Sequence, residues 1–270
     1  MTASSPPPLF TVKRGNNPLL ISMPHVGTYI PPEIAATMTP EAAFVADCDW
    51  HLEQLYGFAE RIGATVLAAT HARYVIDLNR PPDDASLYPG LDITGLIPLE
   101  TFDRVPLYLE GQQPVEADHA KRRTAYWRPY HDALERELAV LKMQNHEVLL
   151  WEAHSIRSQV PRLFEGTLPD FNIGTADGAS ALPGLAADLE AVIDWHGGYS
   201  AVENQRFKGG YITRQYGRPE QGVHAVQLEL SQATYMDETR PYRYDETRAA
   251  EVSTLLEALV QTAMARIATG

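Results

Sequence analysis

The stretch VLLWEAHS, residues 148–155, is a short apolar run that ends in an acid and a histidine. Four consecutive apolar residues are typical of a strand that is buried on both faces of a sheet. The stretch LLISMPH, residues 19–25, has the same form and ends at His25. Because open α/β sheets bind ligands beyond the carboxyl ends of their strands, we expect His25 and His154 to converge on one site.

The rest of the chain alternates between strand-like and helix-like segments. We expect strands at residues 19–23, 64–69, 73–78, 147–151, 211–213 and 225–230, helices at 39–62, 117–142, 182–195 and 244–268, and long loops at 79–101 and 155–169. Thr39, Pro40 and Glu41 supply an N-cap hydroxyl, a proline in the first turn and an acid beside it. This alternation predicts a mainly parallel, doubly wound sheet. No linker is evident, so we expect a single domain over residues 1–270 with a flexible arm at 1–10.

Composition narrows the class of protein. The chain has 270 residues, of which 44% are hydrophobic and 21% charged, as in ordinary globular proteins. A net charge of −13 argues against nucleic acid or an anionic membrane as partner, since both require a basic surface. The single cysteine, Cys48, excludes an internal disulfide and fits a reducing compartment. No apolar run has the length of a membrane span, and the N-terminus does not resemble a signal peptide. We therefore expect a cytoplasmic protein.

Two strand-end histidines favour a metal centre, although half-buried structural histidines would show the same pattern. A catalytic zinc site needs a third protein ligand and one open position. Asp47 and Asp49 lie in the helix predicted after the first strand, where an acid that merely complements the helix dipole is the alternative. Glu152 is another possible ligand, but it would share a face with His154 only if their strand continues as far as these residues. Three further histidines lie in polar contexts and are expected at the surface: His119, His131 and His146.

Asn79 and Arg80 follow the strand predicted at 73–78. An arginine at a strand end before a proline-rich loop suits bidentate recognition of a carboxylate. The alternative is a structural ion pair of Arg80 with Asp77 or Asp83.

Gln227, Glu229 and Ser231 alternate with apolar residues in the last predicted strand, so they share one face. Glu229 is therefore a candidate general base above a metal-bound water. A half-exposed strand would alternate in the same way.

The glycine pair in FKGGYIT, residues 207–213, predicts a flexible wall beside the substrate, with Gly210 and Thr213 as candidate contacts. Cys48 is a poor nucleophile candidate, because the acids on either side of it raise the thiol pKa. The chain has no G-x-S-x-G motif, which further disfavours a serine or cysteine hydrolase.

Six segments, taken together, resemble the N-formylglutamate amidohydrolase family. They are PHVG at 24–27, DCDWH at 47–51, YVIDLNRP at 74–81, EAHS at 152–155, FKGGY at 207–211 and QLE at 227–229. The resemblance extends over residues 18–236. The family is similar in turn to aspartoacylases and zinc carboxypeptidases. It therefore implies a phosphorylase/hydrolase-like fold, which is a three-layer α/β/α sandwich with a mixed, mainly parallel sheet, and one zinc ion per chain.

The resemblance also implies roles for individual residues. The implied zinc ligands are His25, Asp49 and His154. Glu229 corresponds to the acid/base, and the Asn79-Arg80 pair matches the element that holds the substrate carboxylate in aspartoacylases. One position departs from the zinc carboxypeptidases, which have an acid three residues after the first histidine where this chain has Thr28. The acidic ligand must come from elsewhere, and Asp47 remains an alternative to Asp49.

These inferences predict metal-dependent hydrolysis of N-formyl-L-glutamate to formate and L-glutamate, a step of histidine degradation. Arg80, together with Arg157, Arg162 or Arg214, is expected to bind the two carboxylates of this small anionic substrate. A zinc deacylase or exopeptidase acting on another N-acyl amino acid would use the same residues. A non-catalytic acidic binding protein is the remaining alternative. The oligomeric state is not predicted.

Overall fold

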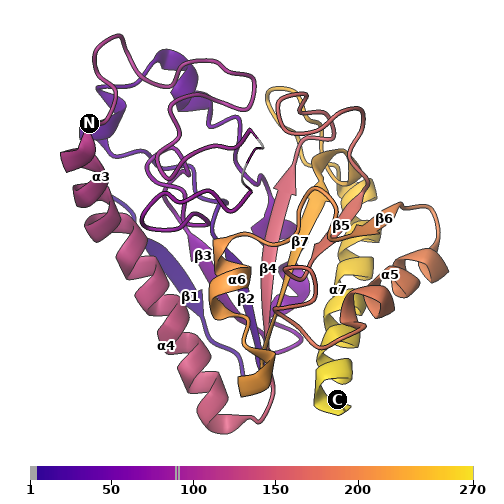
Figure 1. Ribbon diagram of the computed structural model, residues 1–270. Coiled ribbons are helices and arrows are strands. Elements are labelled where there is room, and N and C mark those ends of the chain that lie inside the picture. The colour runs from indigo at the N-terminus through magenta and orange to yellow at the C-terminus, as the bar shows by residue number, and fades with distance from the viewer. Residues whose placement is uncertain (1–4, 89, 91, 270) are drawn as a thin grey trace.

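One seven-stranded sheet forms the centre of the molecule, with strand order β1-β3-β2-β4-β7-β5-β6 (Figure 1). The computed structural model describes residues 5–88, 90 and 92–269. The strands are β1 (Phe10–Lys13), β2 (Leu19–Met23), β3 (Thr65–Ala69), β4 (Val148–Ile156), β5 (Phe171–Gly174), β6 (Ala201–Glu203) and β7 (Val223–Ser231). Four of the six strand pairings are parallel, and only β1–β3 and β5–β7 are antiparallel. The predicted mixed, mainly parallel sheet is confirmed.

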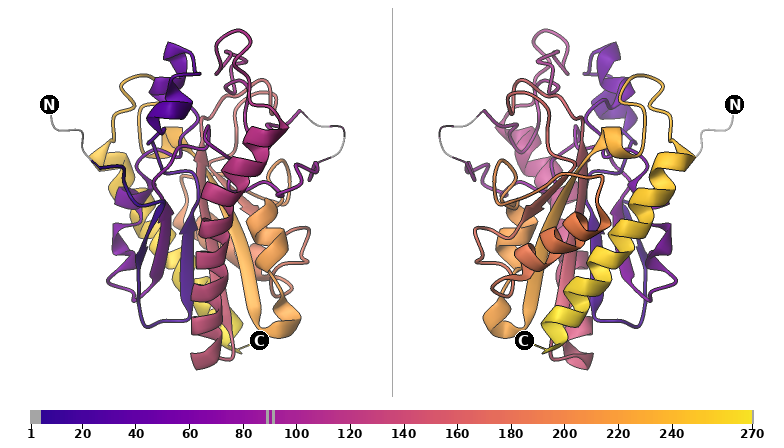
Figure 2. Two further views of the ribbon diagram at one scale, coloured as in Figure 1. Left: turned by 90° about the vertical axis from the view of Figure 1, so that its left-hand side faces the viewer. Right: turned by 90° about the vertical axis from the view of Figure 1, so that its right-hand side faces the viewer.

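Helices cover both faces of this sheet and complete the three layers. The helices are α1 (Pro32–Ala35), α2 (Leu52–Leu55), α3 (Glu116–Arg122), α4 (Arg128–Gln144), α5 (Leu185–His196), α6 (Tyr211–Tyr216) and α7 (Glu246–Thr269). Shorter turns are η1 (Pro40–Phe44), η2 (Gly57–Ala59), the π-helical η3 (Arg123–Trp127), η4 (Pro219–Gln221) and η5 (Gln232–Thr234). Helices α3 and α4 lie on one face, and α5 and α7 lie on the other (Figure 2). Among the described residues, no helix is long and apolar enough to cross a bilayer.

The alternation of side chains along the buried strands places the polar residues on one face. In β4, Leu149, Trp151 and Ala153 belong to the core beneath α5 and α7. Leu150 belongs to the core beneath α4. His154 is an even number of residues from Leu150 along the same strand, so its side chain projects on the α4 side, at the carboxyl end of the strand.

Two predicted strands are wrong. Residues 73–78 form turns, because Val75 N–H bonds to Ala72 O and Asp77 N–H bonds to Leu96 O, outside the sheet. Residues 211–213 begin helix α6 rather than a strand. The side chains of Asn79 and Glu152 accept hydrogen bonds from the first N–H groups of α6 and thereby satisfy its amino end.

The continuous helix predicted at 39–62 is also wrong. The helical start at Pro40 is present, but η1 ends at Phe44, and Val45 after it has a left-handed conformation with φ of 40°. His51 has φ of 62° and precedes the short helix α2. A helix cannot run through residues with positive φ, so the segment divides into three short pieces.

Three short strands, β1, β5 and β6, were not predicted. The arm expected at residues 1–10 is correspondingly shorter, since Thr70 N–H bonds to Leu9 O and Phe10 begins β1. Residues 1–4 lie outside the described residues. The strand predicted at 147–151 continues to Ile156.

The surface position predicted for His131 is wrong, because this residue has no exposed area. Its Nδ1 lies 2.8 Å from the Tyr216 hydroxyl and its Nε2 lies 2.9 Å from Leu78 O. Burial lowers the pKa of His131 to about 3, so the ring is neutral in the folded protein.

Candidate active site

His25, Asp49 and His154 converge at the carboxyl ends of β2 and β4. His25 follows β2 by two residues, and His154 lies near the end of β4. Asp49 precedes α2, and its backbone N–H donates to His25 O at 3.0 Å, which ties the two segments together. One ligand atom from each of the three side chains lies within 4.8 Å of the others, and all three residues are buried.

Both histidines present the same ring atom to Asp49. Asp49 Oδ2 lies 2.8 Å from Nδ1 of His154 and 3.9 Å from Nδ1 of His25. The other nitrogen of each ring meets a second carboxylate. Nε2 of His25 lies 2.7 Å from Asp77 Oδ1, and Nε2 of His154 lies 2.8 Å from Glu152 Oε1. Asp77 and Glu152 can each accept a proton from Nε2, so the Nδ1 atoms, which both face Asp49, are the ring atoms that could bind a cation together with it.

This donor set fits a metal ion. A tetrahedral ion with bonds of about 2.0 Å holds its ligand atoms about 3.3 Å apart. The distances of 2.8 and 3.9 Å from Asp49 Oδ2 to the two histidine nitrogens lie on either side of that value. Two imidazoles and one carboxylate leave a fourth position for water or substrate, as in catalytic zinc sites. Carboxylates behind both histidines are typical of metal centres as well.

Asp49, rather than Asp47, belongs to this group. Asp47 Oδ2 accepts a hydrogen bond from the Phe102 backbone N–H at 3.0 Å. His51, from the same segment, bonds through Nε2 to Tyr242 O. The sequence could not separate the two aspartates, because the irregular segment between η1 and α2 decides which one faces the histidines.

Charge around the two rings differs. Burial lowers the pKa of His25, and the Arg73 charge lowers it further against the effect of Asp77, which favours a neutral ring. Burial would also lower the pKa of His154, but its hydrogen bonds to Asp49 and Glu152 raise it well above the ordinary value. Position 154 thus lies between two acids that favour a positive charge, and a bound cation meets the same demand.

Glu152 supports His154 from behind. Its Oε2 accepts a hydrogen bond from the Thr213 backbone N–H at 3.0 Å and another from the Thr213 hydroxyl. Glu152 has no exposed area. Both of its oxygens are therefore engaged, which makes Glu152 a supporting group for His154 and places Thr213 beneath the site.

Glu229 extends from β7 beside His154, its register partner on β4. Gln227 Nε2 donates to Glu229 Oε2 at 3.4 Å, and Gln227 Oε1 accepts from the Gly210 N–H at 2.7 Å. Burial raises the pKa of Glu229, His154 lowers it and Asp49 raises it again, to a value of about 8. A carboxyl group with this pKa can both accept and return a proton near neutral pH.

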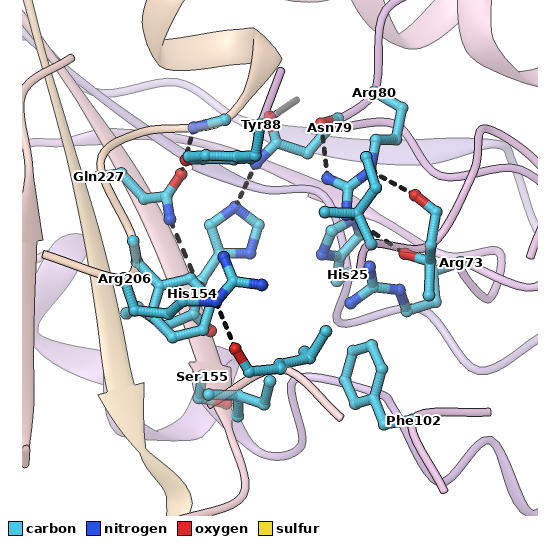
Figure 3. A pocket seen from close by; sticks show the side chains of 17 residues that line it. His25, Arg73, Asn79, Arg80, Tyr88, Phe102, His154, Ser155, Arg206 and Gln227 are labelled. Carbon is cyan, nitrogen blue, oxygen red and sulfur yellow. Dashed lines mark hydrogen bonds between the residues drawn. The ribbon is translucent and has the colours of Figure 1, made fainter. Parts of the chain in front are cut away.

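A pocket opens above these groups (Figure 3). It encloses about 600 Å³ of empty space, including its open mouth. Polar residues from six separate segments line it: His25, Arg73, Asn79, Arg80, Thr94, His154, Ser155, Arg206, Gln227 and Glu229. Tyr88, Ile93, Phe102, Ile156, Leu163 and Phe207 supply most of the apolar wall.

Comparison with known proteins identifies the family. The model of the N-formylglutamate amidohydrolase family matches residues 17–236. The chain belongs to this family. It is 53% identical over 256 residues to the N-formylglutamate deformylase of Pseudomonas aeruginosa, covering 93% of this chain and 96% of that relative. The deformylase of Pseudomonas putida is 50% identical over 252 residues, with 93% and 94% covered.

A solved structure has the same fold. The N-formylglutamate amidohydrolase of Ralstonia eutropha superposes with a TM-score of 0.79 at 27% identity, covering 94% of this chain and 97% of that one. A gene product of Agrobacterium tumefaciens has a TM-score of 0.72 at 18% identity, which supports the fold alone.

Within this amidohydrolase, the predicted substrate arginines occupy different environments. Arg80 lines the pocket and bonds through Nε to Thr94 O at 2.9 Å, without an ion pair to Asp77 or Asp83 among the described residues. Three others do not line the pocket. Arg157 pairs with Asp103, Arg162 pairs with Asp92 and Glu100, and Arg214 bonds to Gly209 O.

Asn79 and Gly210 form the wall between α6 and the group of His25, Asp49 and His154. Asn79 Nδ2 lies 3.0 Å from His154 Nε2, and Asn79 Oδ1 accepts from the Ile212 N–H at 2.9 Å. A β-carbon on Gly210 would lie 2.3 Å from the Asn79 amide, so only glycine fits there. The predicted contact residues thus shape the pocket by packing on each other.

Three residues of the site were not predicted to belong to it: Asp77, which the sequence offered only as a structural partner of Arg80, Arg73 beside it, and Arg206 in the pocket wall. Gln227 lies beside Glu229, on the face that the sequence predicted for both. Asp77 also accepts from Arg73 and from the Asn79 N–H. Asp77 lies in the DLNR motif, but nothing local indicates that its partner is a histidine 52 residues away. Arg206 lies in an irregular segment just after β6, a short strand that the sequence did not predict, so pattern alone gives it no weight.

Proposed function

We propose that this chain hydrolyses N-formyl-L-glutamate to formate and L-glutamate with one zinc ion bound by His25, Asp49 and His154. Membership of the family and the names of the two Pseudomonas relatives support the reaction. The observation that carries the metal assignment is the buried group of two Nδ1 atoms and one carboxylate oxygen above a polar pocket. A divalent ion held there by His25, Asp49 and His154 would supply a Lewis acid able to lower the pKa of water and to polarise the formyl carbonyl.

The supporting carboxylates keep the two rings in the productive tautomer. Asp77 and Glu152 each accept from Nε2, which leaves both Nδ1 lone pairs directed toward Asp49. Thr213 fixes Glu152, and Arg73 fixes Asp77 at 2.5 Å. The site is thus held in place before substrate arrives, so little reorganisation accompanies the reaction.

Glu229 is the proton carrier of the proposed reaction. It removes a proton from the attacking water as the new C–O bond to the formyl carbon forms. It then delivers this proton to the nitrogen of glutamate as the C–N bond breaks, which gives formic acid and the free amine. The proton of the acid then passes to the amine, so the products are formate and the ammonium form of glutamate. A pKa raised to about 8 by burial suits both transfers. Gln227 orients the carboxylate through its bond to Glu229 Oε2.

Arg80 is proposed to bind a substrate carboxylate next to Asn79. Its guanidinium is fixed by Thr94 O, by the Thr94 hydroxyl at 3.2 Å and by Asn79 O at 3.2 Å. These acceptors are neutral and hold the group in place without cancelling its charge.

Formate release from purified protein loaded with zinc tests this function. We expect rapid formate release from N-formyl-L-glutamate and much slower acetate release from N-acetyl-L-glutamate. Glu229→Gln should lose formate release while retaining bound metal, and Glu147→Gln, a change at the other end of β4, should behave as wild type. A zinc-loaded wild-type protein that releases no formate would refute the proposed reaction.

A further inference from the structure

Two arginines that line the pocket lack a carboxylate partner. Arg73, the third, pairs with Asp77. Arg80 and Arg206 form no ion pair within 4.0 Å in the described part of the chain, although both are half-buried. Figure 3 shows Arg80 and Arg206 on opposite sides of the pocket. Since buried charges in proteins are usually paired, two such cations facing one cavity indicate an anionic ligand with two negative groups.

Arg206 is held by neutral groups only. Its Nε donates to Leu163 O at 2.6 Å, and a terminal nitrogen donates to Asp92 O at 3.4 Å. The carboxylate of Asp92 is taken by Arg162 and Arg104. Burial lowers the pKa of Arg206, and the charge of Arg80 lowers it further, while Tyr88, Glu229 and Asp92 offset this only in part.

Aromatic rings fix the orientation of Arg206. Its guanidinium carbon lies 5.7 Å from the ring centroid of Tyr88 and 5.3 Å from that of Phe207. The Tyr88 hydroxyl donates to Gly209 O at 2.8 Å, which anchors the 79–101 loop against the segment that carries Arg206. A guanidinium placed between two rings is ordered before a ligand binds, and this reduces the entropy cost of binding.

The positions of the two arginines distinguish the two carboxylates of glutamate. Arg80 directly follows Asn79, whose amide contacts His154. Arg206 instead bonds to Leu163 O and Asp92 O and packs against Tyr88, and none of these three contacts is with His25, Asp49 or His154. The α-carboxylate is attached to the carbon that bears the amide nitrogen. It must therefore stay near the proposed metal ligands, where the amide reacts. The side-chain carboxylate lies two methylene groups further away.

We infer that Arg206 is the specificity residue that binds the side-chain carboxylate of the substrate, while Arg80 binds the α-carboxylate. The inference rests on the proposed deformylase function. It assigns the second carboxylate to Arg206 rather than to Arg157, Arg162 or Arg214.

The test compares N-formyl-L-glutamate with N-formyl-L-glutamine, which replaces the side-chain carboxylate by a neutral amide of the same shape. Wild type, Arg206→Met and Arg206→Lys are assayed for formate release on both. Lys208→Met is the matched control, because Lys208 is two residues away, carries the same charge and pairs with Asp177 outside the pocket lining. Arg206→Met should lower kcat/KM for N-formylglutamate by about 10- to 100-fold, mostly through KM, and leave N-formylglutamine within about threefold.

The wild-type preference for glutamate over glutamine should therefore disappear in Arg206→Met, survive in part in Arg206→Lys and remain intact in Lys208→Met. An equal loss on both substrates, or an unchanged preference, would overturn the role of Arg206. If wild type released no formate at all, the proposed function would fail. A binding measurement would then test separately whether Arg206 binds a carboxylate. In calorimetry, glutarate should bind wild type about 10- to 100-fold more tightly than butyrate does. Arg206→Met should remove that difference, and its persistence would refute the inference.

Discussion

Replacing Glu152 by glutamine should weaken metal binding without touching a metal ligand. Glu152 Oε1 faces the Nε2 proton of His154, and Oε2 accepts from the N–H and the hydroxyl of Thr213. An amide has only one oxygen, so in the Glu152→Gln variant its NH₂ group must face one of these donors. Loss of a partner behind a metal-bound histidine typically lowers metal affinity 10- to 100-fold, which is about 1.4 to 2.7 kcal/mol. Because two hydrogen-bond donors would then face each other in a buried position, the free energy of unfolding should also fall by about 1–3 kcal/mol.

The assay is competition for Zn²⁺ with a chromophoric chelator, followed on folded protein at a temperature well below the melting transition of each variant. Glu147→Gln is the control. Glu147 Oε2 lies 2.8 Å from His224 Nε2, so the variant also removes the charge of a carboxylate–histidine pair. That pair lies at the amino ends of β4 and β7, far from the site. A zinc affinity of Glu152→Gln within twofold of wild type would refute the claim that Glu152 supports a metal-bound His154.

Three further predictions concern the proton carrier, the pocket wall and the buried histidine of α4. Glu229→Gln should lower kcat by about 10²- to 10⁴-fold with unchanged zinc content, measured by formate release and metal analysis; near-normal turnover would remove Glu229 from the mechanism. Gly210→Ala should lower kcat/KM at least about 10-fold, since its β-carbon would displace Asn79, and retained activity in a folded variant would show that Asn79 need not stay where it is. His131 has a folded-state pKa of about 3, below the unfolded value of about 6.5, so the unfolded chain binds more protons between these values. Its contribution to stability is complete above pH 6.5 and is lost as pH falls. Between pH 7.5 and pH 5, wild type should lose about 2 kcal/mol more unfolding free energy than His131→Gln in urea titrations, and parallel losses would contradict the neutral buried ring.

The sequence predicts the central strands well, because β2 and β4 begin with runs of consecutive apolar residues, at 19–21 and 148–151, that a doubly covered sheet position buries. The edge strands β1 and β6 are short and partly exposed, so they carry no such signal. Residues 73–78 contain a strand-like apolar run, yet Tyr74 and Val75 are buried in turns, beneath the loop that follows. Local pattern cannot distinguish these cases, since the partner that buries the side chains is distant in sequence.

The candidate site divides in the same way. His25, His154 and Glu229 are recognisable because each interrupts or ends an apolar strand. Asp77 and Arg206 are not, because their roles come from contacts with residues far away in the chain. Their positions are fixed by turns and loops, which the hydrophobic pattern does not describe.

Formate release from N-formyl-L-glutamate before and after removal of metal tests the central claim most directly. Purified protein is assayed as prepared, after exhaustive chelation verified by metal analysis, and after addition of one equivalent of Zn²⁺. Activity should disappear with the metal and return with it, and Asp49→Asn should neither retain zinc nor recover. Undiminished formate release from verified metal-free protein would contradict a metal-dependent mechanism.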